Sequence, residues 1–284
     1  MEKIPKYSEF RHWFELCSNN TDVRVTCIAD PEESQQLIYP LMDFLCDQIR
    51  SDILPDKGMF ENRPEYALFR VSQIIKENNP KTAYLTLLRA CLYVRLFKFN
   101  TTWEDEAELV YARTSGWLTS TDFFSSPAST VYHDAVEGGL VQHSLRVAEL
   151  SAQLAQSRLF PNIDLQSALL CALLHDWCKI GSYIPYLKNV KDDVTGQWTK
   201  VAAYKWNDEI KVPLGHGEAS MWMASKFVRL SLEESCAIRY HMGKWRIAEA
   251  DVNALQYANE LYPLVHLIQF ADQLSITKYR VTSC

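Results

Sequence analysis

The sequence lacks a long apolar run. Its longest unbroken apolar stretch, residues 168–174, is far shorter than the roughly 20 residues that a transmembrane helix needs. The opening residues, MEKIPKYSEFRHW, have no apolar core of the kind that a secretory signal contains. We therefore expect a cytoplasmic protein that does not associate with a membrane.

The sequence also lacks any CxxC pair, any internal repeat and any low-complexity tract. Its eight cysteines are scattered, which favours free thiols in a reducing compartment over a disulfide framework. Cys178 is interpreted in the same way, as a packed thiol rather than a nucleophile. The net charge of −6 disfavours a broad basic face that coats nucleic acid, although a narrow basic cleft is compatible with it.

What the sequence does contain is helical periodicity along most of its length, so the predicted fold class is all-α. Residues 1–117 are predicted to form a mainly helical region of unknown role. Its expected elements are helices at 34–50, 67–77, 81–98 and 104–115 and one strand at 21–30. A loop at 118–139, rich in Ser, Thr, Pro and Gly, opens a second predicted domain, residues 118–284. Helices are predicted there at 140–159, 164–178, 217–229, 231–242 and 252–276.

The helical pattern is interrupted between Gly181 and Gly215. The segment YLKNVKDDVTGQWTKVAAYKW has β-branched and aromatic residues around Asp-Asp and Thr-Gly turn signals, which predicts an inserted β-hairpin within 183–212. Six lysines and four acids between 179 and 211 give a slight basic surplus, which suits an anionic substrate. The aromatic residues of the hairpin either stack on nucleobases or fill the hairpin itself; they are Trp198, Tyr204 and Trp206.

A candidate metal site emerges because five of the seven histidines fall within residues 133–241. The segment LQSALLCALL before His175 is apolar nearly all round, which places it in the middle of a helical bundle. His175 and Asp176 follow near its C-terminal end, where the negative end of the helix dipole favours a cation. A buried aspartate also needs a positive partner. Lys179 lies one turn further on the same side, where its ammonium can face an anionic substrate.

The remaining candidates stand at helix ends, at Gly-flanked turns or inside the last helix. Mixed imidazole and carboxylate ligands of this kind suit divalent first-row transition ions. His12 and His266 are interpreted as capping or core residues instead. The further candidates are His133 in the loop, His143 behind two glycines, His216 between Gly215 and Gly217, His241 in a helix's final turn, and Asp272.

The ordered set of GGLVQH, LLHDWCK, LGHG and an AD pair before LS resembles the HD-domain metal-dependent phosphohydrolase superfamily over about residues 125–280. The segment PASTVYHDAVEGGL is similar to the 3′–5′ exoribonuclease and phage-type hydrolase branch. The resemblance implies an HD-domain helical bundle around one or two divalent ions, with Mn, Fe, Co, Ni or Mg as the candidates. It implies that His143, His175, Asp176 and Asp272 hold one ion. It further implies that His216 and His241 help hold a second ion bridged by Asp176, and that His133 lies near the substrate phosphate.

The leading hypothesis from the sequence is hydrolysis of a phosphate ester of a nucleotide or short oligonucleotide by metal-activated water. Asp176, Lys179 and His133 are the expected catalytic residues, and His133 either contacts a phosphate oxygen or protonates the leaving group. A small nucleotide ranks slightly above short RNA or DNA, because the N-terminal region contains no clear multi-strand nucleic-acid module. The alternatives are a nucleotide sensor without turnover, a 3′–5′ exoribonuclease and a metal-dependent oxygenase.

Overall fold

The computed structural model describes residues 64–98, 103–192, 195–209, 212–245 and 247–280. Over these residues the protein is a helical bundle with one two-stranded hairpin, which confirms the predicted all-α class with a small β insertion. The helix predicted at 34–50, the strand predicted at 21–30 and His12 lie outside the described residues. No helix in the described ranges is long and apolar enough to span a membrane.

The first described part of the chain is helical, as the periodicity predicts. Its helices pack on one another and on two later helices, α6 (Gly139–Ala155) and α7 (Leu165–Leu174). A single hydrophobic core therefore runs from Val71 to Ala271. The predicted division into domains at residues 117 and 118 stays a prediction. The three helices are α3 (Pro64–Glu77), α4 (Pro80–Lys98) and α5 (Trp103–Ser120).

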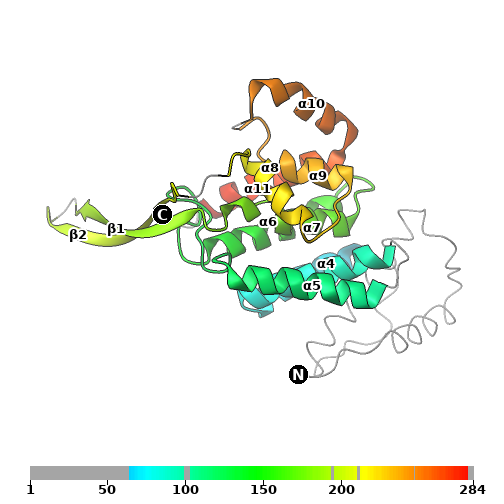
Figure 1. The fold of residues 1–284 in the computed structure, drawn as a ribbon, viewed down its shortest axis with the longest axis horizontal. Helices are drawn as coiled ribbons and strands as arrows, with labels where there is room; N and C mark the ends of the chain where they lie inside the picture. Colours follow the sequence, from blue (N-terminus) through cyan, green and yellow to red (C-terminus); the bar gives the residue numbers. More distant parts are fainter. Residues whose placement is uncertain (1–63, 99–102, 193–194, 210–211, 246, 281–284) are drawn as a thin grey trace, which may run out of the picture.

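Helix α7 (Leu165–Leu174) occupies the centre of the bundle, as its all-round apolar sequence predicts (Figure 1). All of its residues except Ser167 are buried, and α4, α6, α9 and α11 pack around it. Asp164 caps its first turn by accepting a hydrogen bond from the Ser167 amide. The surrounding helices are α6 (Gly139–Ala155), α8 (His216–Ser225), α9 (Leu232–Arg239), α10 (Val252–Leu261) and α11 (Pro263–Arg280).

Most of the helices predicted after the loop end earlier than expected, and those predicted at 140–159, 217–229 and 231–242 end at Ala155, Ser225 and Arg239. The helix predicted at 164–178 ends at Leu174 and is followed by a short 3-10 turn, η2 (Trp177–Lys179). The helix predicted at 252–276 is two helices, α10 and α11, with Pro263 as the first residue of the second. Proline lacks the amide donor that a continuous helix requires and is favoured at a helix start, which explains the break. The capping box of α9, Ser231 with Glu234, forms as predicted.

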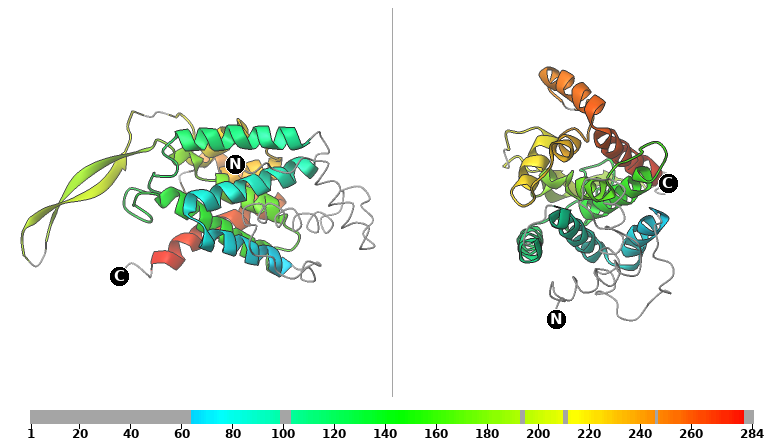
Figure 2. Two further views of the ribbon diagram at one scale, coloured as in Figure 1. Left: turned by 90° about the horizontal axis from the view of Figure 1, so that it is seen from below. Right: turned by 90° about the vertical axis from the view of Figure 1, so that its right-hand side faces the viewer.

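The predicted hairpin forms from β1 (Tyr183–Lys191) and β2 (Trp198–Trp206), paired antiparallel with Tyr183 opposite Trp206 and Lys191 opposite Trp198. It projects away from the helical body (Figure 2). The Asn207 side-chain amide donates to the Gly181 carbonyl at its base, and Asp122 accepts from the Gly181 amide. The loop after α5 therefore anchors the hairpin beside the C-terminal end of α7.

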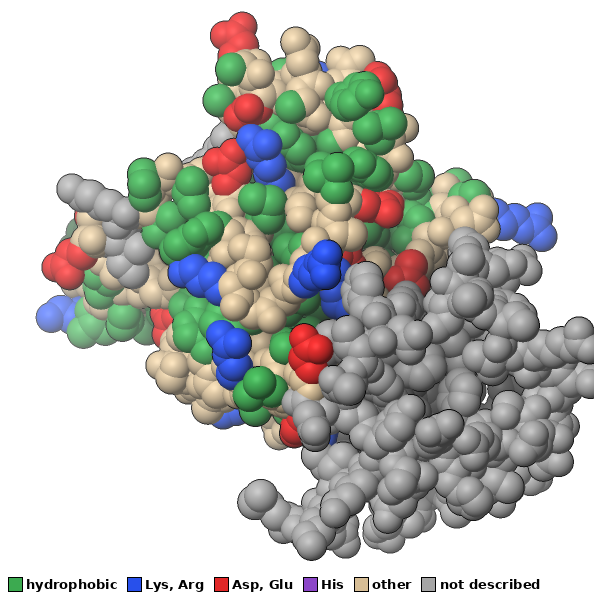
Figure 3. Space-filling view, turned by 45° about the vertical axis from the view of Figure 1, so that its right-hand side comes forward, with side chains coloured by type: hydrophobic (Ala, Val, Ile, Leu, Met, Phe, Trp, Pro, Cys, Tyr) green, Lys and Arg blue, Asp and Glu red, His purple; other side chains and the backbone are tan. Residues whose placement is uncertain are grey.

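On the face drawn in Figure 3, acidic and basic side chains are interspersed with hydrophobic ones, and no large area of one charge stands out among the described atoms.

Candidate metal centre

The end of α7 turns the adjacent His175 and Asp176 toward one centre. On a continuous helix neighbouring side chains point about 100° apart. Here His175 is the C-cap residue, and Asp176 leaves the helical conformation with φ −109° and ψ 18°. Both side chains are buried. The early end of α7 is thus what allows two consecutive residues to serve one site.

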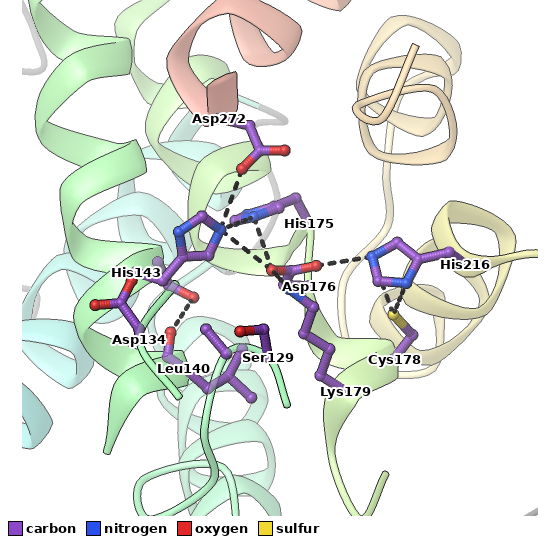
Figure 4. Close-up of polar contacts among 12 residues, drawn as sticks. Ser129, Asp134, Leu140, His143, His175, Asp176, Cys178, Lys179, His216 and Asp272 are labelled. Atoms are coloured by element: carbon purple, nitrogen blue, oxygen red, sulfur yellow. Dashed lines mark hydrogen bonds and ion pairs between the residues drawn. The ribbon is translucent and has the colours of Figure 1, made fainter. Parts of the chain in front are cut away.

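Four donor groups from three helices and the turn after α7 meet at this point (Figure 4). Nε2 of His143 on α6 lies 3.2 Å from Nε2 of His175. The same His143 atom lies 3.2 Å from Asp176 Oδ2 and 3.1 Å from Asp272 Oδ1. Oδ2 of Asp176 is 3.3 Å from His175 Nε2. The structure therefore brings together all four residues predicted to hold one ion.

The hydrogen bonds on the far side of each ring show which nitrogen faces the centre. Nδ1 of His175 donates to the Ala172 carbonyl at 2.7 Å. Nδ1 of His143 lies 3.2 Å from the Ser275 hydroxyl. Because that hydroxyl donates its proton to the Asp272 carbonyl, its oxygen accepts a hydrogen bond from Nδ1 of His143. In the neutral rings both Nε2 atoms then carry lone pairs that face each other and the carboxylates. A divalent ion placed between these atoms would accept their lone pairs.

The other carboxylate oxygen of Asp176 faces two more predicted ligands. Nε2 of His216 lies 2.9 Å and Nε2 of His241 lies 3.7 Å from Asp176 Oδ1. Nδ1 of His241 donates to the Ile238 carbonyl at 2.7 Å, so its Nε2 presents a lone pair. That buried Nε2 has no hydrogen-bond partner among the described residues. An unpartnered buried imidazole aimed at a carboxylate fits a ligand position for a second ion.

His216 reaches the centre because Gly217 permits a close approach of α8 to α9. A Cβ atom at Gly217 would lie 2.0 Å from the Arg239 carbonyl oxygen. Only glycine therefore fits there, as the Gly-flanked sequence predicts. His241 follows the end of α9 rather than occupying its final turn, which corrects the sequence placement by a few residues.

Lys179 does not project freely into solvent. Its ammonium donates to Asp176 Oδ2 at 2.6 Å and is buried with it. Burial lowers the pKa of Lys179, but the Asp176 carboxylate outweighs it and raises that pKa above the usual value. The ammonium is thus a fixed positive charge beside the metal ligands, on the side predicted for it.

His133 lies over the same centre, in the loop before α6. Its ring centroid is 5.0 Å from that of His143, and its Nε2 is buried without a hydrogen-bond partner among the described residues. Burial and the neighbouring His143 and Lys179 lower the pKa of His133 to about 4. Ser129 fixes the loop, because its hydroxyl donates to the His133 carbonyl and accepts from the His133 amide.

The charge balance of the centre favours ionised carboxylates. Burial raises the pKa of Asp176, but Lys179 and His175 outweigh it and hold that pKa well below its usual value. Burial likewise raises the pKa of Asp272, and contacts with His143 outweigh it, so its pKa is also lowered. Both carboxylates are therefore held in the anionic form that binds a divalent ion.

Two residues beside the centre were not identified as site residues from the sequence. Ser275, one turn after Asp272 on α11, orients His143. Cys178 was interpreted as a packed thiol, but its Sγ lies 3.2 Å from Nδ1 and 3.6 Å from Nε2 of His216. The sequence signal for Cys178 was its position two residues after the candidate ligand Asp176. His266, interpreted as a core or cap residue, stacks on Phe270.

The model of the HD domain family matches residues 140–277. The matched segment begins at α6 and contains every candidate ligand described above. This segment of the chain is therefore an HD domain, a family whose members are in general metal-dependent hydrolases. No curated protein and no solved structure matches the chain.

Proposed function

We propose that this protein is a metal-dependent phosphohydrolase that cleaves a phosphate ester of a nucleotide or short oligonucleotide. The observation that carries the proposal is the convergence of imidazole lone pairs and ionised carboxylates from α6, the end of α7 and α11 on one buried point. A charge-paired lysine stands at its edge.

The residues present fit a divalent ion. His143, His175, Asp176 and Asp272 would hold one ion, and Asp176, His216 and His241 would hold a second. Such ions supply Lewis acidity toward water and toward phosphoryl oxygens. The unpartnered Nε2 atom of His241 gives this assignment support beyond the family match.

The chain's own cationic and polar groups would then act on the substrate. The ammonium of Lys179 is fixed where it can attract the phosphoryl group and stabilise charge that develops on it. The buried Nε2 of His133 is placed to contact a phosphate oxygen or the leaving group. The loop that carries His133 and the turn that carries Lys179 both adjoin the base of the hairpin, since Tyr183 donates to the Ala128 carbonyl at 3.3 Å.

The hairpin supports a nucleotide-containing substrate. Its two strands contain four lysines and no acidic residue, and all four lysines are exposed. Its aromatic residues Trp198 and Trp206 lie on one face, as the register shows, and both are exposed. Positive charge that follows a phosphate backbone, together with aromatic rings on which bases stack, is the combination that binds single strands.

The function is tested by purifying the protein, removing metal with a chelator and restoring Mn²⁺, Co²⁺, Zn²⁺ or Mg²⁺. We expect phosphate ester hydrolysis of at least one nucleotide, cyclic nucleotide or short oligonucleotide only in the metal-restored samples. Tight nucleotide binding without turnover in every metal would instead support the sensor alternative. Turnover that is unchanged after chelation would contradict the proposal.

The contribution of the hairpin gives a separate prediction. Trp198→Ala should weaken binding of a fluorescent oligouridylate by about 10-fold, because stacking contributes about 1–3 kcal/mol per base. The matched control is Tyr257→Ala on α10, because Tyr257 is 64% exposed and Trp198 is 69% exposed. Anisotropy titration measures both variants.

Hydrolysis of a small chromogenic phosphodiester should be unchanged in both variants, since neither residue lies in the metal centre. Lys191→Gln combined with Lys200→Gln should also flatten the salt dependence of oligouridylate binding, because fewer counterions are released. Equal losses for Trp198→Ala and Tyr257→Ala would show that the hairpin does not carry the contact.

A further inference from the structure

Tyr84 joins α4 to the turn that carries the candidate ligands His175 and Asp176. Helix α4 packs directly on α7 (Figure 1). The Tyr84 hydroxyl donates to the Leu173 carbonyl at 2.6 Å, and the same oxygen accepts from the indole Nε1–H of Trp177 at 2.8 Å. Both side chains are fully buried. Leu173 and Trp177 stand on either side of the two candidate ligands, so a single hydroxyl bridges the segment that contains them.

The first of these hydrogen bonds supplies a partner that the early end of α7 makes necessary. The last four carbonyls of a helix have no intrahelical amide from which to accept. The Ala172 carbonyl accepts from the His175 ring, and the next carbonyl, that of Leu173, accepts from Tyr84. Without the hydroxyl, a buried carbonyl would lose its hydrogen bond, which costs about 1–3 kcal/mol. Tyr84 therefore stabilises the helix end that allows two consecutive residues to face one centre.

The second hydrogen bond fixes the residue that directly follows Asp176. The indole of Trp177 is a buried donor and needs an acceptor. Its ring centroid lies 5.1 Å from that of Trp117 on α5 and 6.1 Å from that of Phe227 after α8. Because packing holds the ring and Tyr84 holds its Nε1–H, Trp177 restricts the backbone next to Asp176. That restriction matters for the centre, since both oxygens of the Asp176 carboxylate contact site residues.

The loop after α5 supports the same turn at its far end. Asp122 accepts from the Gly181 amide at 2.8 Å. The next residue, Phe123, is buried and packs on Tyr84 with ring centroids 4.7 Å apart. These three supporting residues all precede the HD-domain match at 140–277. Part of the support of the metal centre therefore comes from the N-terminal helices, for which the sequence predicts no role.

We propose that Tyr84 is a positioning residue for the metal centre, so that metal binding by the HD domain depends on a side chain of the N-terminal helices. The proposal rests on the metal centre of the proposed function and adds a residue outside the HD domain to it. The hydroxyl touches neither ion nor substrate and acts through the backbone on both sides of His175 and Asp176. Its removal would leave the Leu173 carbonyl and the Trp177 indole unpaired, and the turn would relax away from the geometry in which both ligands face one centre.

The test is Tyr84→Phe, which removes one oxygen and keeps the ring. The wild type and the variant are freed of metal and titrated with Zn²⁺, and the visible absorption of the Co²⁺ form reports the ligand geometry. We expect the circular dichroism of the wild type, a Zn²⁺ affinity about 10-fold lower and changed Co²⁺ band intensities. A 10-fold loss is the lower end for residues that support ligands. For a small chromogenic phosphodiester at saturating metal, kcat should fall by a comparable factor and KM should stay the same, because the hydroxyl does not contact the substrate.

Tyr111→Phe is the matched control, because the chemical change is identical. Tyr111 also lies in the N-terminal helices, on α5, and its partly buried ring packs against the Arg89 guanidinium. This variant should match the wild type in Zn²⁺ affinity, Co²⁺ spectrum and kcat. Trp177→Phe removes the donor of the second hydrogen bond and should also weaken Zn²⁺ binding. Combined with Tyr84→Phe, its effect should be less than the product of the two single losses, because the two groups share a hydrogen bond.

An unchanged Zn²⁺ affinity and Co²⁺ spectrum in folded Tyr84→Phe would overturn the positioning role and leave the proposed function intact. An equal loss in Tyr111→Phe would also overturn it, because the effect would then reflect stability rather than position. If Tyr84→Phe does not fold, Trp177→Phe decides, and an unchanged Zn²⁺ affinity in that variant would overturn the proposal. A wild-type protein that binds no divalent ion would contradict the proposed function itself.

Discussion

Replacing Asp176 with asparagine should reduce kcat for phosphate ester hydrolysis by about 10³-fold and remove bound metal. Both carboxylate oxygens are used, since Oδ2 faces His143, His175 and Lys179 while Oδ1 faces His216 and His241. An amide cannot present two anionic oxygens, and its NH₂ group would oppose a ligand or the ammonium. Loss of a single electrostatic group commonly costs about 10²–10³ in kcat, and here the carboxylate that would hold both proposed ions is lost as well.

The measurement pairs initial rates with elemental analysis of the purified variant. Asp251→Asn is a suitable control, because this partly exposed carboxylate lies in η3 (Glu249–Asp251) and pairs only with Arg239 among the described residues. We expect its kcat and metal content to match those of the wild type. A decrease in kcat of less than about 10-fold in Asp176→Asn would show that Asp176 does not hold the ions that catalyse the reaction.

Glu234→Gln should lower the free energy of unfolding by about 3–5 kcal/mol. Glu234 forms a buried ion pair with Arg95 of α4 at 2.5 Å, and both side chains are nearly inaccessible. The same carboxylate accepts from the Ser167 hydroxyl of α7 and from the Ser231 amide that starts α9. Removing one charge of a buried pair leaves the other uncompensated, and that cost is of this size.

Chemical denaturation followed by circular dichroism measures the loss. Glu233→Gln is the adjacent control: burial raises the pKa of Glu233, so its charged form is disfavoured and neutralisation should change stability by less than about 1 kcal/mol. Replacing Arg95 and Glu234 together with Met and Leu should recover much of the loss, because no isolated charge remains. A loss below about 1 kcal/mol for Glu234→Gln would mean that the pair contributes little.

The sequence was sufficient to predict the identity of the metal-site candidates, because its signals are local. The apolar stretch before His175 predicts a central helix, and α7 is central. The glycines around His216 predict a close backbone approach, and Gly217 lies against Arg239. The turn signals between Lys191 and Trp198 predict a hairpin, and the strands pair on either side of them.

What the sequence could not give were the features that depend on three-dimensional contacts. The contact between Cys178 and His216 joins residues 38 positions apart, and no periodicity encodes such a contact. The ion pair between Lys179 and Asp176 was also not predicted. Helical spacing predicts that the two side chains lie on the same face of the helix, but it does not predict whether the ammonium faces solvent or the carboxylate. The break before Pro263 was readable in principle, but the apolar pattern on both sides favoured one long helix.

The orientation of two of the ligand rings depends on backbone atoms alone. His175 and His241 each donate from Nδ1 to the carbonyl three residues earlier, at Ala172 and Ile238. Every amino acid carries that oxygen, so substitutions at positions 172 and 238 cannot delete it as they would a supporting carboxylate. In a distant homologue the two imidazoles would therefore keep the same tautomer wherever the backbone at the helix end is preserved. This would hold even if the neighbouring residues no longer showed sequence similarity.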